Sequence, residues 1–319
     1  MEIDIVVCID NKFVMPTGIM IHSICVNNPE VEIAFHVITN QVSDKNKKKL
    51  LDTIIPFHSK SIAFYNVDGI DFSDVPRMED GARLSITTYY RLYLTEILPT
   101  TIQKVLYLDG DIIVRQSLKS LWDTDLTNIA IAATTDAHYH LDSYYERLGY
   151  PVDKGYFNAG VLLINLEYWR EHHLLSAFKD FMKNHADRIV YHDQDVLNYV
   201  LQDSKKELPV KFNLQQGFLW RNKPYPQKYI KEIKEAINDC VILHFTGPNP
   251  WYKSCRHPYR NTFLKYKANT IWKDEPLIED RPMSVRTKKA IATILRKCKL
   301  IPELPPYGKG YLPGLKPLD

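Results

Sequence analysis

Two carboxylates stand one residue apart at the end of the apolar segment Lys-Val-Leu-Tyr-Leu-Asp-Gly-Asp, residues 104–111. Residues i and i+2 of an extended chain point to the same side, so Asp109 and Asp111 face one small volume. Gly110 between them lets a ligand or another segment approach the backbone. Two carboxylates at one point repel unless a proton or a cation lies between them, and Mg²⁺ or Mn²⁺ suits such oxygen ligands. A strand that simply ends in a polar turn is the alternative.

Other polar residues occupy positions that packing alone does not require. Arg91 stands among apolar side chains, so it needs an acidic partner or a phosphate unless its head reaches water. Asp193, Gln194 and Asp195 fill the first turn of a predicted helix, with more polar groups than the helix dipole requires. His244 ends a predicted strand, where a histidine is more often a packed residue than a ligand.

The hydrophobic pattern predicts the elements that must position these side chains. Strands at 3–9, 32–38 and 61–67 alternate with helices at 15–26 and from 43 onward, which is typical of βαβ units in a parallel sheet. Ligands of such sheets bind beyond the carboxyl ends of the strands, where Asp10 and Asp136 each follow a predicted strand. At Asp10, a loop cap explains the residue equally well.

The middle of the chain continues this alternation. Small residues at 159 and 160 indicate a tight turn before a wholly apolar strand, at a place where a ligand or a packed backbone could approach. The predicted segments here are helices at 86–98 and 192–198, a short amphipathic segment at 118–122, and strands at 129–135, 161–165 and 241–247.

The composition excludes several classes of protein. A net charge of +3 gives no reason to expect a nucleic-acid partner, and no run of 18 apolar residues predicts a transmembrane helix. The five cysteines are odd in number and include no Cys-x-x-Cys pair, which indicates a reducing compartment without structural disulfides. Because the N-terminus lacks the basic region of a signal peptide, we expect a cytoplasmic protein.

The composition of the sequence changes after residue 250. Aromatic residues accompany one predicted helix at 261–267, and a basic amphipathic helix is predicted at 284–300. This helix either anchors the protein on an anionic membrane surface or docks on the protein with its basic face in solvent. The proline- and glycine-rich residues 301–317 are expected not to pack. We therefore divide the chain into a catalytic domain at 1–250 and an extension at 251–319.

Six motifs in a fixed order give this sequence a family resemblance. It resembles glycosyltransferase family 8, and most closely the bacterial lipopolysaccharide galactosyl- and glucosyltransferases of that family. The resemblance runs from residue 4 to about residue 251. The motifs are Leu-Ser-Ile-Thr-Thr-Tyr-Tyr-Arg (84–91), Val-Leu-Tyr-Leu-Asp-Gly-Asp (105–111), Leu-Trp-Asp-Thr-Asp-Leu (121–126), Tyr-Phe-Asn-Ala-Gly-Val-Leu-Leu-Ile-Asn (156–165), Asp-Gln-Asp-Val-Leu-Asn (193–198) and His-Phe-Thr-Gly (244–247).

The resemblance implies an α/β fold of the GT-A type, a Rossmann-like nucleotide-sugar transferase with a mixed, mostly parallel sheet and a small C-terminal helical extension. It also implies roles for individual residues. Asp109, Asp111 and His244 would hold the metal, with Mn²⁺ favoured over Mg²⁺ because one ligand is an imidazole. The donor UDP-hexose would be met by Cys8, Asp10, Lys12, Arg91, Gly110, Asp136, Asn158, Ala159, Gly160, Asp193, Gln194 and Gly247.

The activity that the resemblance implies is transfer of glucose or galactose from a UDP-sugar to a saccharide or glycolipid hydroxyl, with retained configuration. Arg91, Asp193 and Gln194 would act on the donor sugar, and Asp195 is a fallback nucleophile. We expect the reaction to serve lipopolysaccharide or other surface-glycan synthesis on the inner face of the cytoplasmic membrane. A metal-dependent nucleotidyltransferase and a non-catalytic sugar-binding relative are the alternatives.

Two departures from the family pattern affect the nucleotide contacts. The run Gly-Pro-Asn-Pro-Trp at 247–251 is one residue shorter than in the family and lacks its usual lysine, for which Lys253 could substitute. Lys12 stands where an uncharged residue is common. The first loop also contains no glycine between Cys8 and Phe13, which disfavours the phosphate loop of a nucleotidyltransferase.

Overall fold

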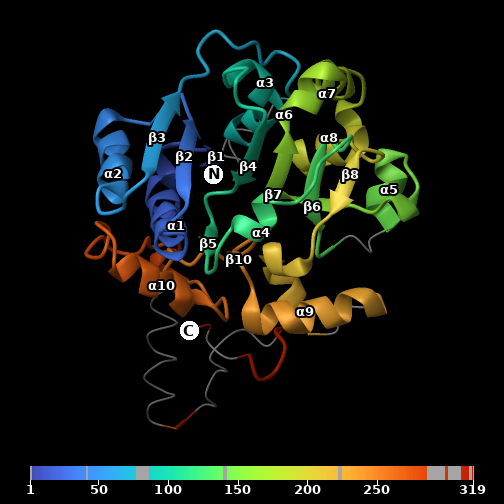
Figure 1. The fold of residues 1–319 in the computed structure, drawn as a ribbon. Helices are drawn as coiled ribbons and strands as arrows, with labels where there is room; N and C mark the ends of the chain where they lie inside the picture. The colour runs from blue at the N-terminus through green and yellow to red at the C-terminus, as the bar shows by residue number, and fades with distance from the viewer. Residues whose placement is uncertain are drawn as a thin grey trace.

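The computed structural model describes residues 2–40, 42–76, 86–138, 142–221, 225–285, 299–300, 310–315 and 318. A seven-stranded sheet in the order β3-β2-β1-β4-β7-β6-β8 forms its centre (Figure 1). Its strands are β1 (Glu2–Cys8), β2 (Glu32–Ile38), β3 (Lys60–Tyr65), β4 (Lys104–Leu108), β6 (Ile131–Thr135), β7 (Phe157–Asn165) and β8 (Lys205–Glu207).

The sheet is mixed and mostly parallel, as the resemblance implied. β1 pairs in parallel with β2 and β4, and β2 pairs in parallel with β3. β7 runs antiparallel to both of its neighbours, β4 and β6. Because β7 is reversed, its first residues lie beside the carboxyl end of β4, so the two predicted ligand-contacting segments meet at one edge.

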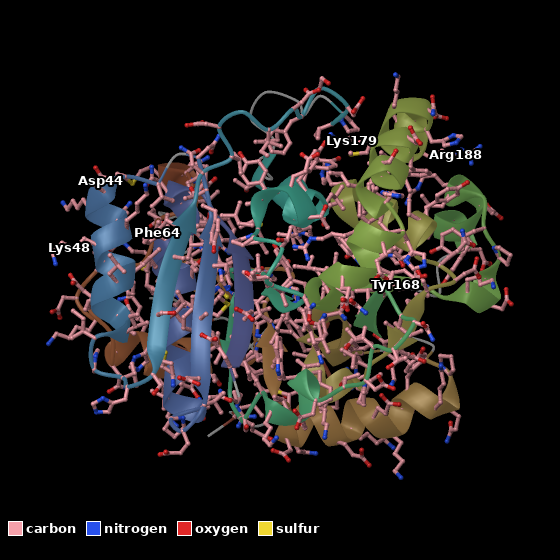
Figure 2. All side chains as sticks on the ribbon, turned by 45° about the horizontal axis from the view of Figure 1, so that its top comes forward. Asp44, Lys48, Phe64, Tyr168, Lys179 and Arg188 are labelled. Carbon is pink, nitrogen blue, oxygen red and sulfur yellow. The ribbon has the colours of Figure 1, made fainter. Side chains whose placement is uncertain are left out.

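Helices cover the sheet and join its strands (Figure 1). α1 and α2 are the crossovers of the predicted βαβ units, and α2 turns Asp44 and Lys48 toward solvent (Figure 2). The helices of the described residues are α1 (Val14–Asn27), α2 (Asp44–Ile54), α3 (Leu94–Ile97), α4 (Lys119–Trp122), α5 (Asp142–Leu148), α6 (Leu166–Glu171), α7 (Leu174–Asn184), α8 (His192–Val200), α9 (Gln227–Asp239) and α10 (Arg260–Ala268), with short 3₁₀ turns between them.

A second, three-stranded sheet begins directly after the acidic pair. It has the order β5-β10-β9, with β5 at Ile112–Val114, β9 at Leu214–Gln215 and β10 at Ile242–His244. The predicted strand ends before the two acids, a second strand begins directly after them, and Asp109 to Asp111 form the junction between two sheets. β10 runs antiparallel to β5 with His244 opposite Ile112, which brings the imidazole beside Asp111.

The core has two layers, one on each face of the large sheet. In β1, Ile3, Ile5 and Val7 belong to one buried apolar cluster and Val6 to the other. Because successive residues of a strand point to opposite faces, a strand buried on both faces is mainly apolar. This explains the apolar run of residues 5–9, and the one acid of the strand interior, Asp4, pairs with His36 of β2 at 2.8 Å.

Two local predictions were wrong in detail. The segment at 86–98 is a 3₁₀ helix (η2, Ile86–Tyr93) followed by one turn of α-helix, not a continuous α-helix. The Asn-Ala-Gly of residues 158–160 lies inside β7 and not in a turn before it. Extended backbone at these residues lets their side chains alternate between the two faces of the sheet, as the site below requires.

The C-terminal segment packs on the same core as the first strand. Trp251, Phe263 and Trp272 belong to the apolar cluster that contains β1. The Trp272 indole lies directly over Gly18 of α1, where a Cβ atom would be 1.8 Å from the ring. Leu318 is also buried, and Leu312 N donates to Leu219 O at 2.8 Å, so the expectation that 301–317 does not pack was wrong for residues 310–315.

The predicted basic helix at 284–300 falls largely on residues 286–298, outside the described residues. Among the described helices, none is both long and apolar enough to cross a membrane. The division of the chain at residue 250 stays a prediction.

Candidate active site

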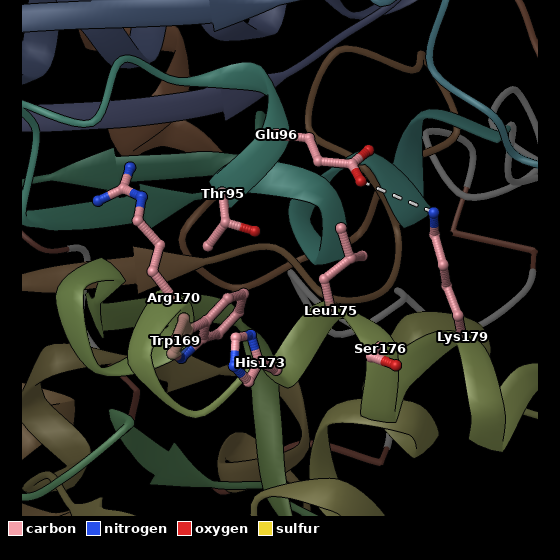
Figure 3. A pocket seen from close by; sticks show the side chains of 8 residues that line it. All are labelled: Thr95, Glu96, Trp169, Arg170, His173, Leu175, Ser176 and Lys179. Carbon is pink, nitrogen blue, oxygen red and sulfur yellow. Dashed lines mark ion pairs between the residues drawn. The ribbon is translucent and has the colours of Figure 1, made fainter.

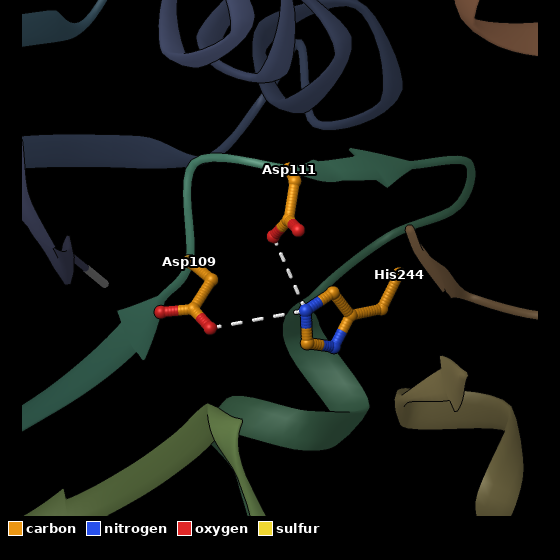
Figure 4. Close-up of side chains that lie close together, drawn as sticks. All are labelled: Asp109, Asp111 and His244. Atoms are coloured by element: carbon orange, nitrogen blue, oxygen red, sulfur yellow. Dashed lines mark ion pairs between the residues drawn. The ribbon is translucent and has the colours of Figure 1, made fainter. Parts of the chain in front are cut away.

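The side chains of Asp109, Asp111 and His244 converge at the junction of the two sheets (Figure 4). His244 Nε2 lies 3.2 Å from Asp111 Oδ1 and 3.8 Å from Asp109 Oδ2. One ligand atom from each residue lies within 4.8 Å of the other two. Two carboxylates and an imidazole within this span form a donor set for a divalent transition metal such as Mn²⁺.

The space beside Gly160 bears on whether a metal ion fits between these residues. A Cβ atom at Gly160 would lie 2.2 Å from His244 Cε1 and 2.8 Å from Asp109 Oδ2. A side chain here would therefore push the imidazole and the carboxylate apart. Glycine leaves this space free, so the three side chains suit a bound cation.

The two carboxylate oxygens of Asp109 have different partners, and Arg91 binds one of them. The Arg91 guanidinium lies 2.9 Å from Asp109 Oδ1, which also accepts from the Tyr107 hydroxyl at 2.8 Å. The second oxygen, Oδ2, is the one directed at His244. Arg91 Nε also pairs with Asp193 Oδ2 at 3.0 Å, and Nη1 donates to Ala159 O at 2.6 Å. The acidic partner predicted for Arg91 is thus a pair of aspartates, Asp193, which is buried, and Asp109, which is half-buried.

Asp193 is the acid most affected by this environment. Burial raises its pKa to about 6, although Arg91 and the hydroxyl of Thr88, which donates at 2.5 Å, act to lower it. The ion pair with Arg91 therefore keeps the carboxylate charged near neutral pH in a position that is only 4% exposed.

A network of amides lies beside the acids. Gln194 Oε1 accepts from Ala159 N at 2.9 Å and from Asn158 Nδ2 at 3.2 Å, while Gln194 Nε2 donates to Asp136 at 3.3 Å. Burial raises the pKa of Asp136, but hydrogen bonds from His138 outweigh burial and hold that pKa below its usual value. These contacts bring the residues predicted to line the sugar pocket into one cluster.

Asp195, which follows Gln194 in helix α8, is held by a different set of hydrogen-bond donors. Its carboxylate accepts five hydrogen bonds, two from Arg147 at 2.7 and 2.9 Å, and one each from the Tyr156 hydroxyl and the backbone N–H groups of Val190 and Tyr191. The side chain is 0% exposed. Such saturation ties helix α8 to α5 and leaves no lone pair for attack on a sugar, which favours a structural role.

The residues predicted to contact the nucleotide do not form one hydrogen-bonded network like that around Gln194. Asp10 caps the turn that follows β1 by accepting from Lys12 N at 2.8 Å, which is the capping alternative of the sequence analysis. Lys12 itself is exposed. Burial raises the pKa of the Cys8 thiol well above its ordinary value, and the nearby Arg91 guanidinium offsets this only in part. Gly247 packs against the amide of Gln216, where a Cβ atom would clash. Lys253 pairs with Glu279 at 3.7 Å.

Sequence reasoning missed residues that act through hydrogen bonds alone. Asn213, Tyr107 and Thr88 each contact a predicted site residue. Thr88 and Tyr107 lie in the motifs at 84–91 and 105–111, which could have drawn attention to them, whereas Asn213 lies in none of the six motifs.

A pocket of about 450 Å³ lies elsewhere, between α3, α6 and α7 (Figure 3). Lys179 on its wall pairs with Glu96 at 3.8 Å. The residues that line it are Thr95, Glu96, Trp169, Arg170, His173, Leu175, Ser176 and Lys179, and they include none of the predicted site residues.

Comparison with known proteins identifies the fold and the family. The model of glycosyl transferase family 8 matches residues 4–255, which include both aspartates, the Asp-Gln-Asp segment and His244. The chain belongs to glycosyltransferase family 8. This membership favours sugar transfer over the alternative of nucleotidyl transfer.

Relatives with known names match most of this chain. General stress protein A of Bacillus subtilis is 31% identical over 84% of this chain and 94% of its own length. Lipopolysaccharide 1,3-galactosyltransferase of Salmonella typhimurium is 28% identical over 83% of this chain and 77% of its own. The crystal structure of the galactosyltransferase LgtC with donor and acceptor sugar analogues matches at a TM-score of 0.75 and 29% identity, over 90% of this chain and all of that one. The fold is the GT-A fold.

The cluster of Asp109, Asp111 and His244 predicts a specific pH dependence of metal binding. Burial would lower the pKa of His244, but Asp111 and Asp109 outweigh burial and raise that pKa above its ordinary value. An imidazole must lose its proton to bind a metal, so protons compete with Mn²⁺ below this raised pKa. We expect the Kd for Mn²⁺ to increase about tenfold per pH unit there. Isothermal titration between pH 5.5 and 8.5 measures this slope.

The matched variant for this experiment is His244→Gln, which has no titrating ligand. It should bind Mn²⁺ weakly and with a flatter pH profile than the parent protein. An affinity of the parent protein that does not change between pH 7.5 and 5.5 would count against His244 as a ligand.

Proposed function

We propose that this protein moves a hexose from a UDP-hexose to a hydroxyl of a saccharide or glycolipid acceptor, with retention of the anomeric configuration. The proposal rests mainly on one observation: Asp109, Asp111 and His244 converge next to the hydrogen-bonded network around the Gln194 amide. The named activities of the relatives, which transfer galactose and glucose in lipopolysaccharide, support a hexose donor and a surface-glycan product.

The two parts of the site suit the two parts of the donor. A divalent cation held by the acids and the imidazole, Mn²⁺ in preference to Mg²⁺, would neutralise charge on the leaving diphosphate. Asp109 Oδ2, Asp111 and His244 Nε2 are the ligands, while Arg91 fixes Asp109 from the other side. Arg91, Asp193, Asp136 and Asn158 would orient the sugar. Cys8, Asp10, Lys12, Gly110, Gly247 and Lys253 are proposed for the nucleotide and its diphosphate.

Retention is proposed to proceed without a covalent enzyme intermediate. A retaining enzyme with a carboxylate nucleophile places that group against the anomeric carbon. Here Asp193 and Asp195 are both buried and paired with arginines, and the side chain between them is the amide of Gln194. We propose same-face attack through an oxocarbenium-like state that Gln194 Oε1 or the Ala159 carbonyl stabilises. The leaving phosphate accepts the proton of the acceptor hydroxyl.

A panel of UDP-sugars with Mn²⁺ tests the proposal directly. We expect UDP release from UDP-glucose or UDP-galactose, slow in water and faster when a lipid-linked oligosaccharide is added. NMR of the product should show the anomeric configuration of the donor. Release of pyrophosphate in place of UDP, or an inverted product, would contradict the proposal.

Attachment to the inner face of the cytoplasmic membrane through residues 284–300 is a separate proposal. Its support is the charge pattern of that segment alone, with six lysines and arginines and no acid. Co-sedimentation with vesicles that contain anionic lipid, compared with neutral vesicles, measures it.

A further inference from the structure

A chain of hydrogen bonds joins the imidazole of His244 to the amide of Gln194 through two buried asparagines. Asn213 Oδ1 lies 2.9 Å from His244 Nδ1, and Asn213 Nδ2 donates to Asn158 Oδ1 at 2.9 Å. Asn158 Nδ2 donates in turn to Gln194 Oε1 at 3.2 Å. Asn213 is 0% exposed, so water does not compete for these bonds.

The partners of Asn158 fix the direction of every bond in this chain. The backbone N–H of Gly160 can only donate, and it donates to Asn158 Oδ1 at 3.1 Å. The other end of the Asn158 amide faces the carboxylate of Asp136 at 3.2 Å and must be the donor. Because Asn158 Oδ1 is an acceptor, the group of Asn213 that faces it is Nδ2. Asn213 Oδ1 therefore faces His244, and Nδ1 of His244 carries the proton.

This direction decides which imidazole nitrogen faces the acids. With the proton fixed on Nδ1, the lone pair of the neutral ring is on Nε2, which lies 3.2 Å from Asp111 and 3.8 Å from Asp109. A lone pair aimed at two carboxylates is repelled unless a cation lies between them. A hydrogen bond to the other ring nitrogen is the usual way in which a protein orients a metal-binding histidine.

We propose that Asn213 is a positioning residue with two functions: its carbonyl holds His244 in the tautomer that binds metal, and its amino group holds Asn158 against Gln194. The proposal rests on the metal-dependent sugar transfer proposed above. It assigns the two ends of one side chain to two separate steps, metal binding and donor-sugar orientation.

Two substitutions separate these functions. Asn213→Leu removes both hydrogen bonds, and we expect its affinity for Mn²⁺ to be about 10- to 100-fold weaker. Asn213→Asp keeps an acceptor for His244 Nδ1–H but cannot donate to Asn158. We therefore expect Asn213→Asp to bind Mn²⁺ nearly as tightly as the parent protein and yet to release UDP from UDP-sugars much more slowly. Mn²⁺ affinity is measured on the full chain without nucleotide by isothermal titration.

Asn28→Leu is the control for a general loss of stability. Asn28 is also buried, and its amide donates to Ile24 O at 2.9 Å and accepts from Leu118 N at 2.7 Å, on contacts that the site does not use. Asn28→Leu should unfold at lower urea concentration and bind Mn²⁺ with the parent affinity. Equal Mn²⁺ affinity for Asn213→Leu and the parent protein would overturn the proposal, as would a loss in Asn213→Asp that matches the loss in Asn213→Leu.

The same titration separates this proposal from the proposed function. If the parent protein does not bind Mn²⁺ at all, the metal site itself is wrong and sugar transfer loses its main support. If the parent protein binds Mn²⁺ and Asn213→Leu binds it equally well, only the role of Asn213 fails. If the affinities follow the expected order but no UDP-sugar is cleaved, Asn213 keeps its role at the metal and the donor assignment fails.

Discussion

Replacement of Asp109 by asparagine should abolish Mn²⁺ binding and reduce sugar transfer roughly a thousandfold or more. An amide offers one neutral oxygen and one N–H group where the carboxylate offers two charged oxygens. In Asp109→Asn, that oxygen can face either Arg91 and Tyr107 or the His244 side, but it cannot serve both. UDP release from UDP-glucose and UDP-galactose, followed over a range of Mn²⁺ concentrations, measures the effect.

Asp123→Asn is the matched control for Asp109→Asn. Asp123 pairs with Lys119 on the surface of the protein, 2.8 Å away, and should be replaced without effect on either measurement. Near-normal turnover of Asp109→Asn at saturating Mn²⁺ would show that the acids do not hold the metal.

Removal of the Arg91 guanidinium should cost the most stability of any change at the site. Arg91→Met leaves the half-buried carboxylate of Asp109 and the buried carboxylate of Asp193 without their shared cation. Breaking a buried pair such as Arg91–Asp193 costs about 3–5 kcal/mol of unfolding free energy. The Arg91 guanidinium also lies over the Tyr107 ring at 4.2 Å, a contact that methionine replaces only in part. Urea unfolding, followed by tryptophan fluorescence, measures the loss.

The same variant should show a characteristic pH dependence. Arg91 lowers the pKa of Asp193, so its removal raises that pKa further above the ordinary value. An acid whose pKa is raised by folding contributes stability at low pH and loses that contribution as pH rises through the folded pKa. The deficit of Arg91→Met should therefore be smaller at pH 5 than at pH 8. A deficit that grows at pH 5 would contradict the buried-pair assignment.

Arg260→Met provides the comparison for Arg91→Met. The Arg260 guanidinium donates to the carbonyls of Pro250 and Tyr252 and has no carboxylate partner among the described residues. Its loss removes hydrogen bonds but strands no buried charge. We expect a smaller decrease in unfolding free energy, and one that changes little between pH 5 and pH 8.

The sequence predicted most of what depends on local pattern. Apolar runs located β1, β2 and the buried strand that precedes the acids, because strands buried on both faces are made mainly of apolar residues. The side-by-side geometry of Asp109 and Asp111 follows from the two-residue repeat of extended chain. The location of His244 beside them came only from family resemblance, since nothing in the sequence gives the register of β10 on β5.

What the sequence did not predict depends on contacts between distant segments. The strands before and after Gly110 belong to different sheets, and the sequence does not predict this because the segment is apolar on both sides of the acids. Asn213 lies between a 3₁₀ turn and the two-residue strand β9, where pattern carries no information. The hydrogen bonds to Asp195 likewise need Arg147 from another helix. Nothing near Asp195 in the sequence indicates this pairing, so Asp195 was a candidate nucleophile, whereas its contacts favour a structural role.

The strand β10 that supplies His244 has a consequence for how the protein is made. Asp109 and Asp111 leave the ribosome long before His244 does, because the imidazole comes from the second half of the chain. Until β10 pairs with β5, the nascent chain has the two acids without the imidazole nitrogen beside them. The proposed cation would therefore bind late in biogenesis, and it would stabilise only chains in which the small sheet has formed.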